Sequence, residues 1–136
     1  MASRSKTDLN EILSDAYDKA CVEYLNLYPN ESQPFLTCTY RSKEEQNQLY
    51  QQGRTTAGKK VTNAQGGESP HNYNPSAAFD IGFIALNKKM DWNKINFIRF
   101  AEIIEKIQPL VEWGGRWATF SDLPHFQLKN WRKYVK

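Results

Sequence analysis

Residues 69–86 read SPHNYNPSAAFDIGFIAL, and this stretch decides how the chain folds. Its first half is rich in turn residues, which predict a loop. The second half, AAFDIGFIAL, is almost continuously apolar and predicts a largely buried β-strand. One histidine, His71, stands in the turn, and one carboxylate, Asp80, interrupts the strand.

Upstream of this stretch, apolar residues at three-and-four spacing predict an amphipathic helix over residues 8–28. Thr7 or Asp8 is the expected cap, with Glu11 as the capping-box partner. Alternating β-branched and aromatic residues predict a strand over 35–40. The segment SKEEQNQLYQQG predicts a second helix, with Ser42 as N-cap, Glu45 at its third position and Gly53 as its stop. Residues 54–70 are polar and Gly-rich and predict a long, mobile loop.

Downstream, residues 91–113 predict one long helix with Asp91 near its cap. The pair Gly114-Gly115 breaks the chain, and residues 124–129 predict a final short strand. This order of elements indicates an α+β domain in which helices cover one face of a small, mostly antiparallel sheet. With 136 residues, we expect a single domain over 1–136.

Composition restricts the function only loosely. No apolar run is long enough to cross a bilayer, and residues 1–17 lack the apolar core of a signal peptide, so we expect a cytoplasmic product without stable membrane insertion. Cys21 and Cys38 are expected to be free, buried thiols. The net charge of +3 suits an anionic polymer, whether nucleic acid or cell wall, but does not choose between them.

The chain contains only two histidines, His71 and His125, and each lies beside turn residues next to a predicted strand. Two imidazoles and one carboxylate, here Asp80, form the ligand set of catalytic zinc sites and leave a fourth position for water. Such a water needs a base, and Asp122, three residues before His125, is the natural candidate. A His and an Asp at an arbitrary gap also occur by chance, so the residues alone leave a site without metal open.

Several spaced blocks in the right order narrow this choice: Ser-x-His at 69–71, Ala-x-Asp at 78–80, Trp-Gly-Gly at 113–115 and Asp-x-Pro-His-Phe-Gln at 122–127, preceded by Tyr40-Arg41-Ser42, Gln46, Leu49-Tyr50 and Gly53-Arg54-Thr55. From about Phe35 to Leu128 the chain resembles the family of D-alanyl-D-alanine carboxypeptidases and L-alanyl-D-glutamate endopeptidases. These zinc peptidases share a fold with the hedgehog signalling domain.

The resemblance implies that His71, Asp80 and His125 bind one Zn²⁺ per chain and that Asp122 is the general base. Arg41 would contact the substrate or the developing oxyanion, with a structural salt bridge as its alternative. Ser69 would hydrogen-bond the substrate or only shape the turn. Ligand type restricts the metal without excluding manganese or cobalt.

The positions of two pairs of hydrophobic residues are left to be predicted, and the sequence departs from the family pattern in two places. Trp113 and Trp117 would be either cleft wall or core anchors, and Phe126 and Leu128 are expected in the core. The gap from His71 to Asp80 is nine positions, two more than in many members, and Asn-Pro-Ser replaces the usual glycine of the turn. Hence the loop must bulge and still return Asp80 to the metal. An Asp in place of a Glu as base demands a closer approach to the metal water.

The leading functional hypothesis is an L-alanyl-D-glutamate endopeptidase of the phage endolysin type, acting on the peptidoglycan stem peptide as a monomer. It would act on the cell wall after release from the host cytoplasm. A D,D-carboxypeptidase is the alternative within the class. Outside the class stand a non-catalytic zinc module and nucleic-acid binding through a basic C-terminal helix carrying Trp131 and Tyr134; we expect no nucleic-acid partner.

Overall fold

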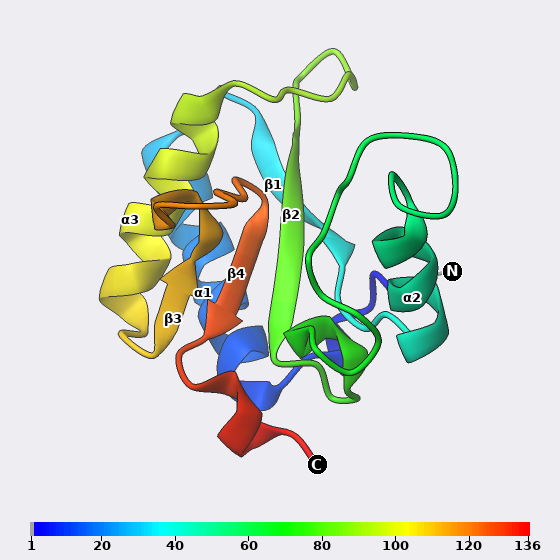
Figure 1. The fold of residues 1–136 in the computed structure, drawn as a ribbon. Helices are drawn as coiled ribbons and strands as arrows, with labels where there is room; N and C mark the ends of the chain where they lie inside the picture. Colours follow the sequence, from blue (N-terminus) through cyan, green and yellow to red (C-terminus); the bar gives the residue numbers. More distant parts are fainter. Residues whose placement is uncertain (1) are drawn as a thin grey trace.

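The protein is described by a computed structural model that covers residues 2–136. Four antiparallel strands form one sheet in the order β1-β2-β4-β3 (Figure 1). In chain order the helices and strands are α1 (Glu11–Leu27), β1 (Gln33–Cys38), α2 (Lys43–Gln51), β2 (Ala78–Ile84), α3 (Lys94–Ile107), β3 (Val111–Trp113) and β4 (His125–Leu128). The expected α+β class is confirmed.

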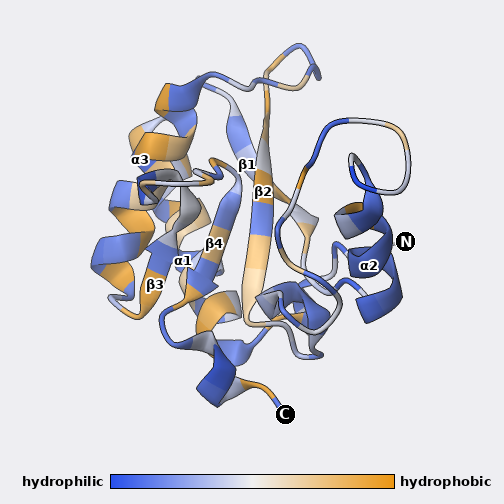
Figure 2. Ribbon diagram, in the orientation of Figure 1, coloured by the Kyte–Doolittle hydropathy of each residue, from blue (hydrophilic) through white to orange (hydrophobic). Residues whose placement is uncertain are grey.

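The two long helices, α1 and α3, pack beside each other on one side of the sheet, whereas α2 lies apart at the other side with the long loop that follows it (Figure 1). Hydrophobic residues concentrate in α1, α3 and the strands, and α2 and its loop are mostly hydrophilic (Figure 2). The apolar core therefore lies between the sheet and α1 and α3, and the opposite face of the sheet is free for polar side chains.

Strict alternation along the two central strands separates these faces. The side chains directed to the core are Phe79, Ile81 and Phe83 of β2 and Phe126 and Leu128 of β4, all fully buried. Because side chains alternate between the faces of a strand, Asp80 and His125 lie on the opposite face. The expectation that Phe126 and Leu128 belong to the core is confirmed.

The register of the sheet then sets which polar residues become neighbours. Asp80 of β2 is paired with His125 of β4 on one side and with Cys38 of β1 on the other. One step along, Gln127 of β4 is paired with Glu112 of β3. The register thus places a row of hydrogen-bonding side chains across the face that the core does not use.

The start of α1 differs from the expectation. Asn10, rather than Thr7 or Asp8, caps the helix by accepting a hydrogen bond from Ile12 N at 2.8 Å. Lys6–Asp8 form a separate 3₁₀ turn, and the carbonyl of Asp8 accepts from Ser76 N at 2.7 Å. Because this contact ties the segment to the loop before β2, the helix begins only at Glu11.

The long helix expected over 91–113 is also wrong in its extent. Asn93 is the N-cap, with Asp91 close to it as expected, but the helix begins only at Lys94 and ends at Ile107. Pro109 has no N–H to donate and disfavours a helical conformation in the residue before it. The remaining segment, Val111–Trp113, forms the edge strand β3, which the apolar periodicity had concealed.

Other expectations hold. Ser42 caps α2 by accepting from Glu45 N at 3.0 Å, and Gly53 follows the helix with a φ of 79°. The strand expected over 35–40 begins two residues earlier, at Gln33. Cys21 and Cys38 are free thiols, Cys38 buried and Cys21 half-buried. Within residues 2–136, no helix combines the length and apolar character needed to cross a membrane.

Removing the ring of Phe126 tests the position of the core. This side chain stacks on Phe79 at 5.4 Å between ring centroids and contacts Phe100 edge-on at 5.3 Å. We expect Phe126→Ala to lower the free energy of unfolding by about 3–5 kcal/mol, measured by urea denaturation. Phe120, 73% exposed, is the matched control, and Phe120→Ala should change it by less than about 0.5 kcal/mol. Equal effects of the two substitutions would place the core elsewhere.

Candidate functional site

Three side chains from separate parts of the chain meet on the open face of the sheet. His71 Nε2 lies 3.2 Å from Asp80 Oδ1 and 3.3 Å from His125 Nδ1, and His125 Nδ1 lies 3.0 Å from the same carboxylate oxygen. Both imidazoles are buried, with exposures of 2% and 6%. The structure thus brings together His71, Asp80 and His125.

The orientation of the His71 ring is set by a hydrogen bond on the side of the ring that faces away from Asp80. Its Nδ1 lies 2.7 Å from the carbonyl oxygen of Thr39, which can only accept, so Nδ1 carries the proton and donates it. Nε2 is consequently the nitrogen that faces Asp80, and it offers a lone pair there when the ring is neutral. His71 itself lies in a short 3₁₀ turn, Pro70–Asn72, at the end of the long loop.

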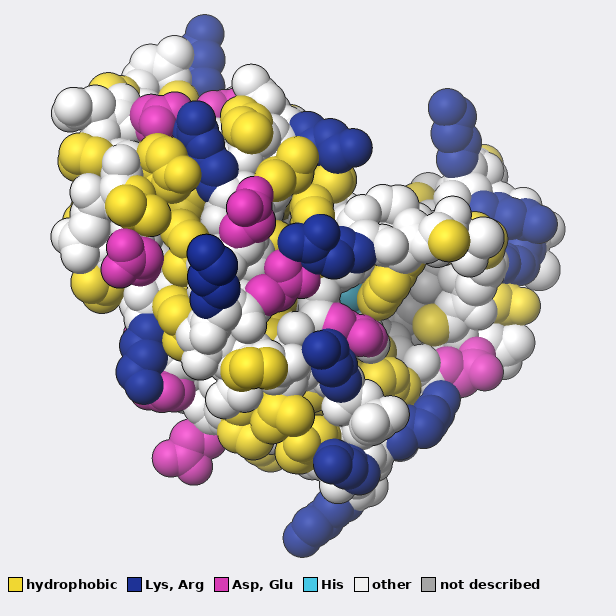
Figure 3. All heavy atoms as spheres, turned by 90° about the vertical axis from the view of Figure 1, so that its left-hand side faces the viewer, with side chains coloured by type: hydrophobic (Ala, Val, Ile, Leu, Met, Phe, Trp, Pro, Cys, Tyr) yellow, Lys and Arg dark blue, Asp and Glu magenta, His cyan; other side chains and the backbone are white. Residues whose placement is uncertain are grey.

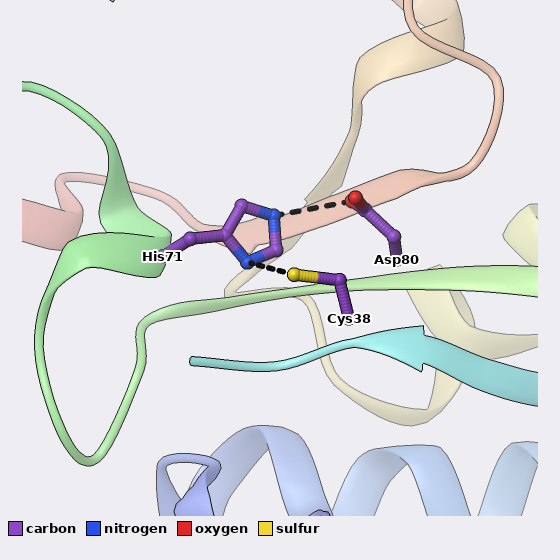
Figure 4. Close-up of side chains that lie close together, drawn as sticks. All are labelled: Cys38, His71 and Asp80. Carbon is purple, nitrogen blue, oxygen red and sulfur yellow. Dashed lines mark hydrogen bonds and ion pairs between the residues drawn. The ribbon is translucent and has the colours of Figure 1, made fainter. Parts of the chain in front are cut away.

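Cys38, His71 and Asp80 also form a group whose donor atoms are close enough to hold a metal ion. Figure 4 shows Cys38 and Asp80 at opposite nitrogens of the His71 ring. Cys38 Sγ is 3.7 Å from Nδ1, the nitrogen that donates to Thr39, and not beside Nε2. A cation bound at Nε2 would therefore be shared with Asp80 and His125, and Cys38 would lie behind the ring.

The His125 ring is fixed in the same way by a different acceptor. Its Nε2 lies 2.8 Å from Gln127 Oε1, and Gln127 Nε2 donates to Glu112 Oε1 at 2.7 Å. When the ring is neutral, His125 Nδ1 is left with a lone pair directed at Asp80 and His71. In their neutral forms the two imidazoles thus present one nitrogen each to the same point.

These groups lie at the bottom of a pocket of about 480 Å³. In the view of Figure 3 a histidine side chain is visible in a hollow whose rim carries acidic and basic side chains. Residues from the long loop, from α2 and from the segment before β4 line it, among them Val61, Thr62, Ser69, Trp117 and Asp122. The pocket is open to solvent on one side and can admit an extended ligand.

Arg41 lines this pocket, and its contacts do not neutralise its charge. Its guanidinium donates to Gln46 Oε1 at 3.1 Å and contacts Cys38 Sγ at 3.5 Å. No carboxylate of residues 2–136 lies within ion-pair distance of it. The structural salt bridge considered for Arg41 is therefore absent from the described part of the chain.

The position of Asp122 depends on close backbone packing with Gly114. The Asp122 N–H donates to the Gly114 carbonyl at 3.0 Å. A Cβ on Gly114 would lie 2.6 Å from the Asp122 carbonyl oxygen and 3.2 Å from His125 Cβ. Only glycine fits there without moving the segment that carries both residues. This accounts for the first glycine of the Trp-Gly-Gly block.

The two tryptophans at and after that block have different positions, one in the core and one in the pocket wall. Trp113 is 4% exposed, stacks on Phe126 and donates from Nε1 to the Leu123 carbonyl at 2.7 Å. Trp117 lines the pocket, with its ring 5.4 Å from that of His125. One tryptophan is a core anchor and the other is part of the cleft wall.

Ser69 shapes the turn before His71. Its hydroxyl accepts from His71 N at 3.2 Å, and Asn72 Oδ1 accepts from Ser69 N at 3.2 Å, which together form a capping box. The longer gap between His71 and Asp80 is accommodated away from the pocket, because Ser76 bonds the backbone of Asp8 and Asn10. The loop bulges toward the N-terminal segment and still returns Asp80 to the histidines.

The electrostatics of the cluster follow from burial and proximity. Burial lowers the pKa of His71, but the charge of Asp80 and the hydrogen bond to it outweigh this effect and raise the pKa to about 10. Burial raises the pKa of Asp80, but the charge of His71 and the hydrogen bonds from both imidazoles hold it far below its usual range. Asp122 is exposed as a residue, yet loss of solvent around its carboxyl raises its pKa.

Comparisons with known proteins show what the chain is similar to. Residues 62–128, which include His71, Asp80, Asp122 and His125, match the family described as D-alanyl-D-alanine carboxypeptidase. The chain is 40% identical over 98 residues to the peptidoglycan L-alanyl-D-glutamate endopeptidase CwlK of Bacillus subtilis (strain 168). The segment that carries these four residues is thus similar to the D-alanyl-D-alanine carboxypeptidase family.

A solved structure shows the same fold. The L-Ala D-Glu endopeptidase ChiX of Serratia marcescens superposes with a TM-score of 0.71 at 21% sequence identity, over 98% of this chain and 92% of that one. The alignment with CwlK covers 68% of this chain and 59% of the relative's length. The chain thus spans about three fifths of that relative.

The roles of several residues that hold the site were not found from the sequence. Gln127 and Glu112 fix His125, Gln46 fixes Arg41, and the Thr39 carbonyl fixes His71. Gln127 carried a usable signal, because a residue two positions after His125 in a strand lies on the same face. Thr39 carried none, since its contribution comes from the backbone.

The coupled pair of His71 and Asp80 predicts how the metal-free protein responds to pH. His71 has a folded pKa of about 10 against its ordinary 6.5, so its contribution to stability is complete below pH 6.5 and is lost as the pH rises toward 10. The free energy of unfolding, measured in chelator, should fall by at least about 1 kcal/mol between pH 6.5 and 9.5. Asp80→Asn should abolish most of this slope; an equal slope in both proteins would assign it to other groups.

Proposed function

We propose that the chain is a zinc-dependent peptidase that hydrolyses the L-alanyl-D-glutamate bond of the peptidoglycan stem peptide. The observation that carries the proposal is the meeting of His71, Asp80 and His125 at one point, in a chain 40% identical to an endopeptidase of that specificity. The proposed catalytic residues are Asp122 and Arg41, and the proposed site for the enzyme's action is the cell wall, reached after release from the cytoplasm.

The donor set fits a zinc ion. Tetrahedral zinc with bonds of about 2.0–2.1 Å separates its donor atoms by roughly 3.3 Å. The three separations among the donor atoms are 3.0, 3.2 and 3.3 Å. When both imidazoles are neutral, each offers a lone pair to this point. His71, Asp80 and His125 would therefore hold the metal, and Cys38 would not.

When bound, zinc supplies Lewis acidity that polarises a scissile carbonyl and activates water. Asp122 then acts as the base: it accepts the proton that the attacking water loses and returns it to the leaving amine. A raised pKa suits this role, because the carboxyl must first take up a proton and then release it.

Arg41 is placed to stabilise negative charge. It is the only lysine or arginine among the residues lining the pocket, and its charge has no carboxylate partner within residues 2–136. It would bind the substrate or the oxyanion that develops on the attacked carbonyl. Ser69 lines the same pocket and could offer its hydroxyl to the peptide as well as to the turn.

Analysis of the products tests the specificity. Purified peptidoglycan digested by the zinc-loaded protein should release fragments with a new N-terminal D-glutamate, detected by mass spectrometry. Chelator should stop the release, and added zinc should restore it. Loss of a single terminal alanine would instead indicate the D,D-carboxypeptidase activity that the description of the family names. Zinc binding without any cleavage would favour a non-catalytic module.

Two substitutions separate metal binding from proton transfer. Asp122→Asn should keep the bound zinc and lower kcat by about 10²–10⁴-fold, because the base is lost while the donors stay. His71→Ala should lose zinc and the stability that zinc confers. The measurements are zinc content by atomic spectroscopy and the rate of fragment release. Full activity of Asp122→Asn would move the base elsewhere, and unchanged zinc content of His71→Ala would refute the ligand set.

A further inference from the structure

The two imidazoles of the site are oriented by acceptors of different kinds. His71 donates to the backbone carbonyl of Thr39, which can act only as an acceptor and is fixed in β-sheet geometry beside Cys38. His125 meets the side-chain amide of Gln127, whose two ends differ in polarity. If the amide turned over, its NH₂ group would face His125 Nε2 and favour the other tautomer. The orientation of His125 therefore requires something that fixes the amide.

Glu112 supplies that constraint. Its carboxylate accepts at 2.7 Å from Gln127 Nε2, and an ionised carboxylate has no proton to donate. The NH₂ end of Gln127 must face Glu112, so the oxygen end must face His125. A neutral His125 must then carry its proton on Nε2, which leaves the lone pair on Nδ1, 3.0 Å from Asp80 Oδ1.

The register of the sheet brings Glu112, Gln127 and His125 within hydrogen-bonding distance in sequence. Glu112 and Gln127 are cross-strand partners in β3 and β4, and Gln127 follows His125 by two positions on the same face. Gln127 is 9% exposed and lines the pocket, whereas Glu112 does not line it. No lysine or arginine of residues 2–136 lies within ion-pair distance of Glu112. The hydrogen bond from Gln127 is thus the polar contact that compensates the charge of the Glu112 carboxylate.

We propose that Glu112 and Gln127 are positioning residues that fix the tautomer and ring orientation of His125, so that Nδ1 is the nitrogen offered to a metal. The effect on metal affinity rests on the proposed function, but the effect on the tautomer does not. An amide between the carboxylate and the imidazole also attenuates the negative charge that His125 experiences, compared with a carboxylate in direct contact. Partners of this outer kind typically change metal affinity about 10–100-fold when they are removed.

Three changes test the proposal in the full chain. Gln127→Leu removes the acceptor for His125, and Glu112→Met removes only the group that fixes the amide. The double exchange Glu112→Gln with Gln127→Glu rebuilds the relay with carboxylate and amide swapped, because the new glutamine can donate to the new glutamate. Glu31→Gln, whose carboxylate pairs with Arg99 at the surface at 2.8 Å, is the matched control.

Zinc affinity is measured by competition with a chromophoric chelator, and the tautomer of His125 by nitrogen NMR of the metal-free protein. We expect about 10–100-fold weaker zinc binding for Gln127→Leu, a smaller loss for Glu112→Met, and affinity within about threefold of the parent for the double exchange and the control. The parent and the double exchange should show a proton on Nε2, and Gln127→Leu a mixture of tautomers.

Parental zinc affinity in Gln127→Leu, or a neutral His125 in the parent with its proton on Nδ1 instead of Nε2, would overturn the proposal. If Gln127→Leu fails to fold, as judged by circular dichroism, the double exchange decides: affinity no better than that of Glu112→Met refutes the relay. A parent that binds no zinc would refute the proposed metal site, while the NMR measurement would still decide the tautomer.

Discussion

The register between β2 and β4 is the constraint on which the rest of the structure depends. It places Asp80 opposite His125 and, by the alternation of side chains, Phe79 opposite Phe126 on the other face. A slip of one residue would turn the carboxylate and the imidazole into the apolar core and expose the aromatic rings. The stacking of Phe79 on Phe126 therefore stabilises the pairing that builds the site, and packing and chemistry are specified by the same hydrogen bonds.

The site collects polar groups whose burial is costly. Two imidazoles and a carboxylate are removed from water within 3.3 Å of one another, and each is compensated by a directed partner. The Thr39 carbonyl holds one ring and Gln127 holds the other, so the two facing nitrogens converge before any ligand arrives. Without a cation the cluster must retain a proton, which explains the raised pKa of His71 beside Asp80. A divalent ion would replace that proton, and metal binding and folding are consequently coupled.

The sequence predicted those features that depend on local chemistry or on short repeats. Ser42 and Gly53 delimit α2 as expected, and the nearly continuous apolar run of residues 77–86 predicted the central strand. The C-terminal end of α3 was misplaced because the apolar spacing continues through Leu110 and Val111, and Pro109 was not weighed against it. The proximity of His71 and Asp80 to His125 came from the family resemblance and not from periodicity, since nothing local brings residues 45 or more positions apart together. Glu112 and Gln46 were missed because their roles depend on tertiary neighbours.

Gln46, 1% exposed, joins two parts of the pocket. Its amide oxygen accepts from Arg41, and its nitrogen donates to the Ala64 carbonyl at 2.9 Å. The Arg54 guanidinium donates a second hydrogen bond, to the Thr62 carbonyl at 3.0 Å. The part of the wall around residues 62–64 is therefore held against α2 before a peptide enters. Less conformational entropy is lost from this segment when a ligand binds, and a larger share of each contact is available as affinity.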